Sequence, residues 1–97
     1  MCGIAGFITN KKYSNNELVN AVSIMSDEIF YRGPDSNGVW TDNNKGIALS
    51  HRRLSVLDVS CAGHQPMVSN TGRYVLTFNG EIYNHNSLRK RIGSGHL

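Results

Sequence analysis

The chain opens with Met1-Cys2-Gly3-Ile4-Ala5-Gly6-Phe7, and the apolar character of this stretch continues nearly to residue 9. Residues 3–9 therefore predict a short, buried strand that the polar residues 10–12 end. A chain that begins with a buried strand places its terminus inside the fold. If Met1 is removed, Cys2 carries both a thiol and a free α-amine. That amine, with a reference pKa of about 7.7 to 8.0, can be the base that a thiol nucleophile needs.

The next segment has helical periodicity. Ser14 is followed three residues later by Glu17, which matches a capping box. We expect a helix from about Glu17 to Phe30, stopped by the Gly33-Pro34 pair. Its apolar stripe consists of Leu18, Val22, Met25 and Ile29.

Short strands and turns account for most of the remaining chain. Residues 42–46 are rich in types that accept a positive φ, so they predict a hairpin turn. We expect, in chain order, strands at 38–41 and 47–52, an irregular or strand-like stretch at 54–59, a loop at 60–66, a turn at 69–72, a strand at 73–78 and a helix at 86–92. The predicted fold class is α+β. Since one long helix cannot cover two sheets, we expect a fragment, or a chain completed by another chain.

Composition excludes several classes of protein. Of the 97 residues, 39% are hydrophobic and 18% are charged, which is typical of a globular domain. No apolar run approaches the roughly 20 residues of a membrane span, and the N-terminus does not resemble a signal peptide. We therefore expect a cytoplasmic protein without a membrane partner.

Charge and cysteine content exclude further classes. The net charge of +3 is concentrated in one late cluster, residues 89–91, which is not the basic stripe that nucleic-acid binding requires. Cys2 and Cys61 are too few for a disulfide scaffold. The four histidines and these cysteines show no metal-site spacing, so no metal site is predicted.

Five segments of the chain resemble one family. They are Met1-Cys2-Gly3-Ile4-Ala5-Gly6-Phe7, Tyr31-Arg32-Gly33-Pro34-Asp35-Ser36, His51-Arg52-Arg53-Leu54-Ser55-Val56-Leu57-Asp58, Ala62-Gly63-His64-Gln65-Pro66-Met67 and Phe78-Asn79-Gly80-Glu81-Ile82-Tyr83-Asn84. In this order they are similar to the glutaminase domain of glutamine-hydrolysing asparagine synthetases, which are class II, N-terminal-nucleophile amidotransferases. The resemblance runs from residue 1 to about residue 91. Pro34 and Phe78 favour this branch and its relatives in surface-polysaccharide pathways.

The resemblance implies a four-layer αββα sandwich, the Ntn-hydrolase fold, of which residues 1–97 form about the first half. It implies L-glutamine as substrate, with released ammonia feeding ATP-dependent asparagine synthesis. No cofactor is expected in this domain; ATP and Mg are expected in an ATP-pyrophosphatase synthetase domain that these residues do not include. Expected partners are that domain and the remainder of the amidotransferase domain. Homo-oligomer formation stays open.

The resemblance also assigns catalytic roles. Cys2 is the expected nucleophile, which attacks the side-chain amide of glutamine and forms a glutamyl thioester. The Asn79 side chain and the Gly80 N–H are the expected oxyanion hole, and both also bind substrate. Two structural alternatives remain: a buried, inert Cys2, and Asn79-Gly80 as an ordinary hairpin turn.

Further residues are expected around the substrate. Arg53 matches the anchor for the α-carboxylate, because a guanidinium contacts a carboxylate at two points. Glu81 is expected to accept from the α-ammonium, or else to form a surface ion pair. Arg32 and Asp35 are expected to brace the backbone near the site. Backbone edges around the glutamine come from Leu54, Ser55, Val56 and Leu57.

Three functional hypotheses stay open at this stage. The first is a glutaminase that supplies ammonia to aspartate or to a polysaccharide-pathway acceptor. The second is a truncated, inactive fragment that keeps the site residues without a competent pocket. The third is a non-enzymatic module in which Arg53 and Glu81 bind glutamine while Cys2 is blocked.

Overall fold

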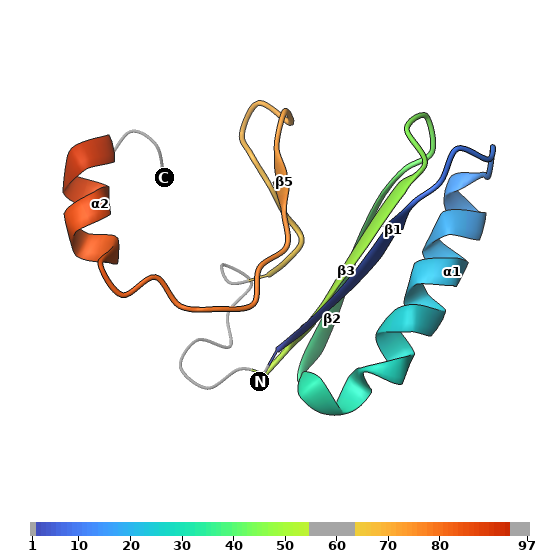
Figure 1. Cartoon of the computed structure of the whole chain (residues 1–97), viewed down its shortest axis with the longest axis horizontal. Helices are drawn as coiled ribbons and strands as arrows, with labels where there is room; N and C mark the ends of the chain where they lie inside the picture. Colours follow the sequence, from blue (N-terminus) through green and yellow to red (C-terminus); the bar gives the residue numbers. More distant parts are fainter. Residues whose placement is uncertain (1, 55–63, 94–97) are drawn as a thin grey trace.

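The main sheet is antiparallel, with β3 between β1 and β2. In this computed structural model the described residues are 2–54 and 64–93. The elements are β1 (Gly3–Ile8), α1 (Asn15–Glu28), a single 3₁₀ turn η1 (Phe30–Arg32), β2 (Ser36–Asp42), β3 (Ile47–Arg53), β4 (Met67–Val68), β5 (Val75–Leu76) and α2 (His85–Ile92). Helices and antiparallel sheets occur together, which confirms the predicted α+β class (Figure 1). The expected stretch at 55–59 and most of the loop at 60–66 lie outside the described residues.

The hairpin of β2 and β3 forms as the sequence predicts. Asp42 pairs with Ile47 at its closed end. The Asp42 carboxylate accepts hydrogen bonds from the N–H groups of Asn44 and Lys45, at 3.0 and 3.3 Å. Gly46 has φ 68°, a conformation that residues with a Cβ rarely adopt. The short polar turn therefore sets the register of the hairpin.

The capping box of α1 is present. Glu17 N–H donates to the Ser14 side chain at 3.1 Å, and Ser14 N–H donates to the Glu17 carboxylate at 3.0 Å. Because Ser14 is the cap, the helix begins at Asn15, two residues before the predicted start. It ends at Glu28, so Phe30 belongs to the following 3₁₀ turn.

A small core joins α1 to one face of the main sheet. Its buried hydrophobic residues, among those described, are Leu18, Val22 and Ala48. Phe7 and Val39 pack against them at their edges. The prediction of Met25 in the buried stripe was wrong: Met25 is 36% exposed, and Ser26, one turn after Val22, is fully buried instead. The Ser26 hydroxyl donates to the Asn37 Oδ1 of β2 at 2.6 Å, and this bond explains why a polar side chain is buried at this position.

The β4–β5 hairpin lies on the side of the main sheet opposite α1 (Figure 1). Its pairing joins Met67 to Leu76 and Val68 to Val75. The predicted strand at 73–78 was too long, because within the described residues the ladder extends over two residues of each strand. The helix expected at 86–92 is confirmed as α2, which projects away from the main sheet (Figure 1).

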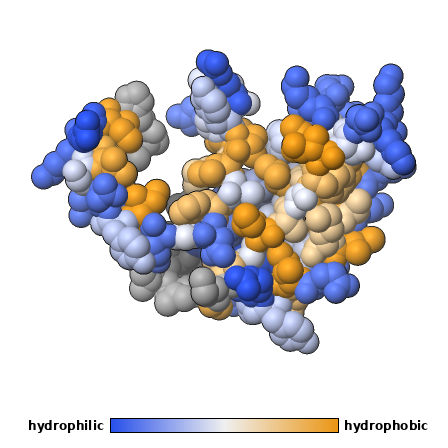
Figure 2. Space-filling view, viewed as in Figure 1, coloured by the Kyte–Doolittle hydropathy of each residue, from blue (hydrophilic) through white to orange (hydrophobic). Residues whose placement is uncertain are grey.

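Much of the apolar surface remains open. The radius of gyration is 14.8 Å, above the roughly 13 Å expected of a compact 100-residue domain. On the sheet face away from α1, Ile4 is 49% exposed and Ile8 is 79% exposed. Hydrophobic side chains are correspondingly visible over the sheet and the hairpin in Figure 2. The described residues thus bury one face of the main sheet and leave much of the other face uncovered.

The capping box can be tested by substitution. Ser14→Ala removes the acceptor for Glu17 N–H and should lower the free energy of unfolding by about 0.5–2 kcal/mol. Urea unfolding followed by far-UV circular dichroism measures the change. The matched control is Ser23→Ala in the middle of α1, which should be neutral or slightly stabilising, since alanine is the better helix former. Equal losses in both variants would contradict the role of the cap.

Candidate active site

A cavity of about 330 Å³ lies at the end of the main sheet where β1 begins. It gathers residues from four separate parts of the chain, and its described lining consists of Cys2, Leu54, Gln65, Phe78, Asn79, Gly80 and Glu81. Pockets for small molecules run from roughly 300 to 1,000 Å³. This cavity is therefore of a size for a ligand such as one amino acid.

Cys2 lies at the cavity because of strand pairing. Gly3 is opposite Arg52 in the β1–β3 ladder, so Cys2 follows at the end where β3 leads into Leu54. The Leu54 N–H donates to the Cys2 sulfur at 3.4 Å. The Arg32 Nε donates to the Cys2 carbonyl at 3.3 Å. Cys2 is half-buried and free of any disulfide.

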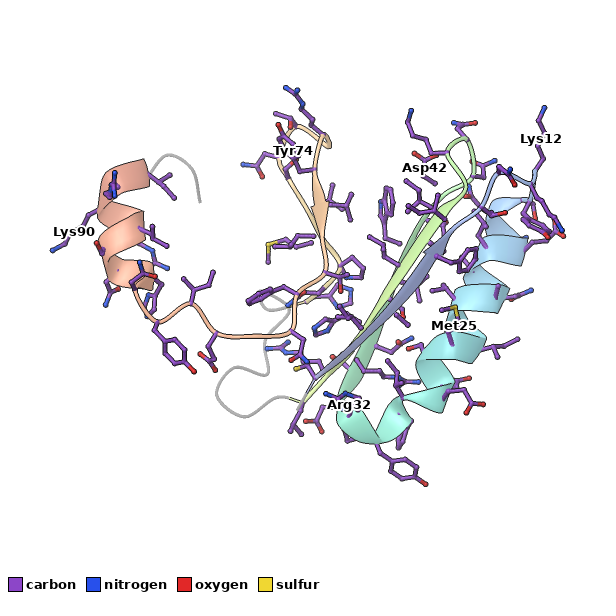
Figure 3. The ribbon with its side chains drawn as sticks, viewed as in Figure 1. Lys12, Met25, Arg32, Asp42, Tyr74 and Lys90 are labelled. Atoms are coloured by element: carbon purple, nitrogen blue, oxygen red, sulfur yellow. The ribbon has the colours of Figure 1, made fainter. Side chains whose placement is uncertain are left out.

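Arg32 and Asp35 brace the backbone of the site. Figure 3 shows Arg32 at the end of the sheet where β1 begins. The Asp35 N–H donates to the Arg53 carbonyl at 3.0 Å, and this docks the loop onto the end of β3. Gly33 permits that approach, since a Cβ there would lie 2.3 Å from the Arg52 carbonyl carbon. The Arg32 side chain thus contacts the Cys2 main chain, whereas Asp35 contacts Arg53 through its main-chain N–H.

Asn79, Gly80 and Glu81 form an exposed stretch along the cavity wall. No described strand follows Gly80 before α2 begins at His85. The alternative of an ordinary hairpin turn at Asn79-Gly80 therefore does not apply to the described residues.

The main chain of Phe78, directly before Asn79, is held from two sides. Its N–H donates to the Gln65 Oε1 at 2.6 Å. Its carbonyl lies 3.1 Å from the His51 Nε2. Sequence reasoning assigned no site role to His51 or Gln65, although each lies within a segment that resembles the amidotransferases. Their function depends on contacts with Phe78, which sequence spacing does not show.

The structure describes only some of the residues that are predicted to bind substrate. Leu54 and Glu81 line the cavity, whereas Arg53 ends β3 beside Leu54 and is not among the described lining residues. Arg53 shares its sheet face with His51, because side chains alternate along a strand. Ser55, Val56 and Leu57 lie outside the described residues.

Among the described residues, His51 is a titratable group whose pKa the fold clearly shifts. It is 2% exposed, and burial lowers the pKa of its imidazole below 6.5. The hydrogen bond with Phe78 opposes this shift, while the positive charges of Arg53 and His64 add to it. The ring is therefore neutral near pH 7. Since a carbonyl can only accept, the proton must be on Nε2.

Two larger hollows lie elsewhere. One, of about 580 Å³, opens between α1 and β1, and the other, of about 620 Å³, lies along the edge strand β1 and is also lined by Met25 and Thr77. Both have mainly apolar linings, and Glu17 in the first is already used in the helix cap. Small-molecule sites need convergent polar groups, so the smaller cavity at Cys2 is the candidate site.

The described residues contain no group of three or more His, Cys, Asp or Glu side chains that could hold a metal ion. In the same two ranges, 2–54 and 64–93, neither helix is long and apolar enough to cross a membrane.

Comparison with known proteins identifies the family. The family described as "Glutamine amidotransferase domain" matches residues 1–96. The chain belongs to this glutamine amidotransferase family. Asparagine synthetase B [glutamine-hydrolyzing] of Escherichia coli is 40% identical over 93 residues, covering 96% of the chain and 16% of that protein. Asparagine synthetase [glutamine-hydrolyzing] 3 of Bacillus subtilis is 36% identical over 94 residues, covering 95% of the chain and 15% of that protein.

A relative with a different name is also similar. Amidase chry2 of Gibberella zeae is 33% identical over 100 residues, covering 95% of the chain and 15% of that protein. This amidotransferase chain therefore spans about one sixth of the length of these relatives.

The buried His51 predicts a specific pH dependence of stability. Because its pKa is lower in the folded state, the unfolded chain takes up the proton first as pH falls. His51 contributes no pH dependence above about pH 6.5, the ordinary histidine value. Below that pH, stability should fall until the folded-state pKa is reached.

His51→Gln should remove this part of the pH dependence. Urea midpoints measured between about pH 5 and pH 8 give the slope. The matched control, His85→Gln on the exposed start of α2, should keep it. An unchanged slope in His51→Gln would show that other groups cause the effect.

Proposed function

We propose that this chain carries the glutaminase site of a glutamine amidotransferase, which hydrolyses L-glutamine to L-glutamate and ammonia. The observation that supports this most is the shared cavity: Cys2 and the Asn79-Gly80 pair line one amino-acid-sized space although Cys2 and Asn79 are 77 positions apart in sequence. Family membership and the names of the relatives support the same chemistry.

In the proposed reaction the Cys2 thiolate attacks the side-chain amide carbon of glutamine. Leu54 N–H, which already donates to the sulfur, helps hold that atom in place. The carbonyl oxygen becomes negative in the tetrahedral intermediate, and the Asn79 amide and Gly80 N–H stabilise it. As the intermediate collapses, the C–N bond breaks and ammonia leaves with a proton. Water then hydrolyses the thioester, which releases glutamate and restores the thiol.

The general base in this proposal is the α-amine of Cys2, which requires removal of Met1. An α-amine titrates near neutral pH, so it can take the thiol proton and return one to the departing ammonia. Nucleophile and base then belong to one residue. Arg32, which donates to the Cys2 carbonyl, helps fix the main chain of this residue.

The α-ammonium and α-carboxylate groups of glutamine also need partners in this proposal. Glu81 on the cavity wall would accept from the substrate α-ammonium, and Arg53 would reach the α-carboxylate together with backbone groups of residues 54–57. The proposed complete domain is an αββα sandwich, in which a second sheet would cover the open face of the main sheet. Such a sheet is consistent with the exposure of Ile4 and Ile8.

The released ammonia has two candidate acceptors in this proposal. By analogy with the asparagine synthetase relatives, it would feed an ATP-dependent amidation of aspartate in a further domain. An acceptor in a polysaccharide pathway is the alternative. The proposal places ATP and Mg in that further domain and none in the cavity at Cys2.

Substitution of Cys2 tests the proposed chemistry. In the protein as its gene encodes it, with Cys2 shown by N-terminal sequencing to be the first residue, Cys2→Ala should abolish glutamate release from glutamine. Cys61→Ala, at the other cysteine of the chain, should retain the wild-type rate. An active Cys2→Ala variant, or wild-type protein that binds glutamine in a calorimeter without hydrolysing it, would rule out this function.

The oxyanion role has a separate test. Asn79→Ala removes one donor and should lower kcat by about 10²–10³-fold with a smaller change in KM, since the donor acts mainly on the charged intermediate. Steady-state glutamate release gives both constants. A rise in KM at constant kcat would assign Asn79 to ground-state binding instead.

A further inference from the structure

Phe78 directly precedes the proposed oxyanion pair, and its main chain is hydrogen-bonded. β5 ends at Leu76, two residues earlier, and the chain then leaves its strand partner. Asn79 and Gly80 are both exposed. In the described part of the chain, neither the Asn79 amide nor the Gly80 N–H has a hydrogen-bond partner. What orients them must therefore act on the residue before them.

His51 provides the first support. It lies in β3, the middle strand of the main sheet, and is almost fully buried. Its Nε2 donates to the Phe78 carbonyl at 3.1 Å. That carbonyl and the Asn79 N–H belong to one planar peptide group. A ring fixed in the sheet thus fixes the plane from which Asn79 begins.

Gln65 provides the second support. Its Oε1 accepts from the Phe78 N–H at 2.6 Å. An N–H group can only donate, so the amide oxygen of Gln65 must face Phe78. The Gln65 main chain is itself packed on β2, because a Cβ on Gly38 would meet the Gln65 carbonyl oxygen. Both supports therefore lead back to the main sheet.

We propose that His51 and Gln65 are positioning residues that hold the Phe78 main chain from both sides and thereby aim the Asn79 amide and the Gly80 N–H at the reacting carbonyl. This assignment rests on the proposed glutaminase function. Oxyanion donors act through preorganisation, because donors that must first reorient lose most of their effect. An exposed Asn-Gly pair is flexible by itself, since glycine populates many backbone conformations. The two side chains supply the rigidity that the pair lacks.

Three variants test the positioning role in the protein as its gene encodes it. His51→Met and Gln65→Met keep side-chain length and remove the hydrogen bond. Each should lower kcat by about 10–100-fold with KM changed less than about threefold, because a displacement near 1 Å can cost 10²-fold. His51→Gln restores an N–H donor near the position of Nε2 and should recover most of the rate.

A double variant and a control sharpen the test. Since both side chains act on one residue, His51→Met combined with Gln65→Met should lose much less than the product of the single losses. The control is Thr77→Val, which removes the neighbouring hydrogen bond from the Thr77 hydroxyl to the Ser50 carbonyl, 3.4 Å long. It should keep kcat within about twofold, because it leaves both bonds to Phe78 in place. Equal losses in Thr77→Val and the two Met variants would overturn the proposal.

Amide hydrogen exchange reads the contact without any activity. Gln65→Met should accelerate exchange of the Phe78 N–H at least about tenfold, whereas Thr77→Val should not. Far-UV circular dichroism confirms that each variant folds; if His51→Met unfolds, Gln65→Met decides the test. An inactive wild type would overturn the proposed function, whatever the exchange results. An active wild type with fully active Met variants, or unchanged Phe78 exchange, would overturn the positioning role alone.

Discussion

The register between β1 and β3 is the constraint on which the rest of the structure depends. Gly3 pairs with Arg52, so Cys2 arrives where β3 passes into Leu54. Side chains alternate between the two faces of a strand. Phe7 in β1 and Ala48 in β3 therefore face α1, while Cys2 is directed to the opposite side, where the cavity lies. A slip by one residue would turn Cys2 toward the helix and away from Asn79.

Alternate side chains of β3 make contacts on opposite faces of the main sheet. Toward the helix, Arg52 donates to the Ser26 carbonyl at 3.2 Å and pairs with Asp27 at 2.8 Å, and its guanidinium lies over the Phe30 ring. The Asp27 side chain is 74% exposed, so the ion pair alone contributes little. The bond to Ser26 matters more, since it is buried and provides a partner for the guanidinium of Arg52, a residue that is 8% exposed. Toward the cavity, His51 holds Phe78.

The candidate site therefore lies at a junction between two units. Cys2 and Leu54 flank strands of the main sheet, and this sheet also contains His51 and contacts Gln65, the two positioning residues. The segment after the β4–β5 hairpin supplies Asn79, Gly80 and Glu81. Among the described residues, two hydrogen bonds join β3 to this segment, one between His51 and the Phe78 carbonyl and one from the Thr77 hydroxyl to the Ser50 carbonyl. In the proposed enzyme, catalytic geometry at such a junction depends on the contacts that hold Phe78 as much as on the groups that touch substrate.

The sequence by itself determined the elements with strong local signals and the family. The Ser14–Glu17 capping box, the turn at 42–46 and the opening strand each follow from short-range chemistry, and all three are present. The predicted burial of that strand was wrong for one of its faces, where Ile4 and Ile8 are exposed. The tertiary structure alone decided that Ser26 replaces Met25 in the helix interface, because strand pairing places Asn37, the partner of the Ser26 hydroxyl. It also decided that His51 and Gln65 meet at Phe78, a contact between residues 13 and 27 positions apart that no periodicity encodes.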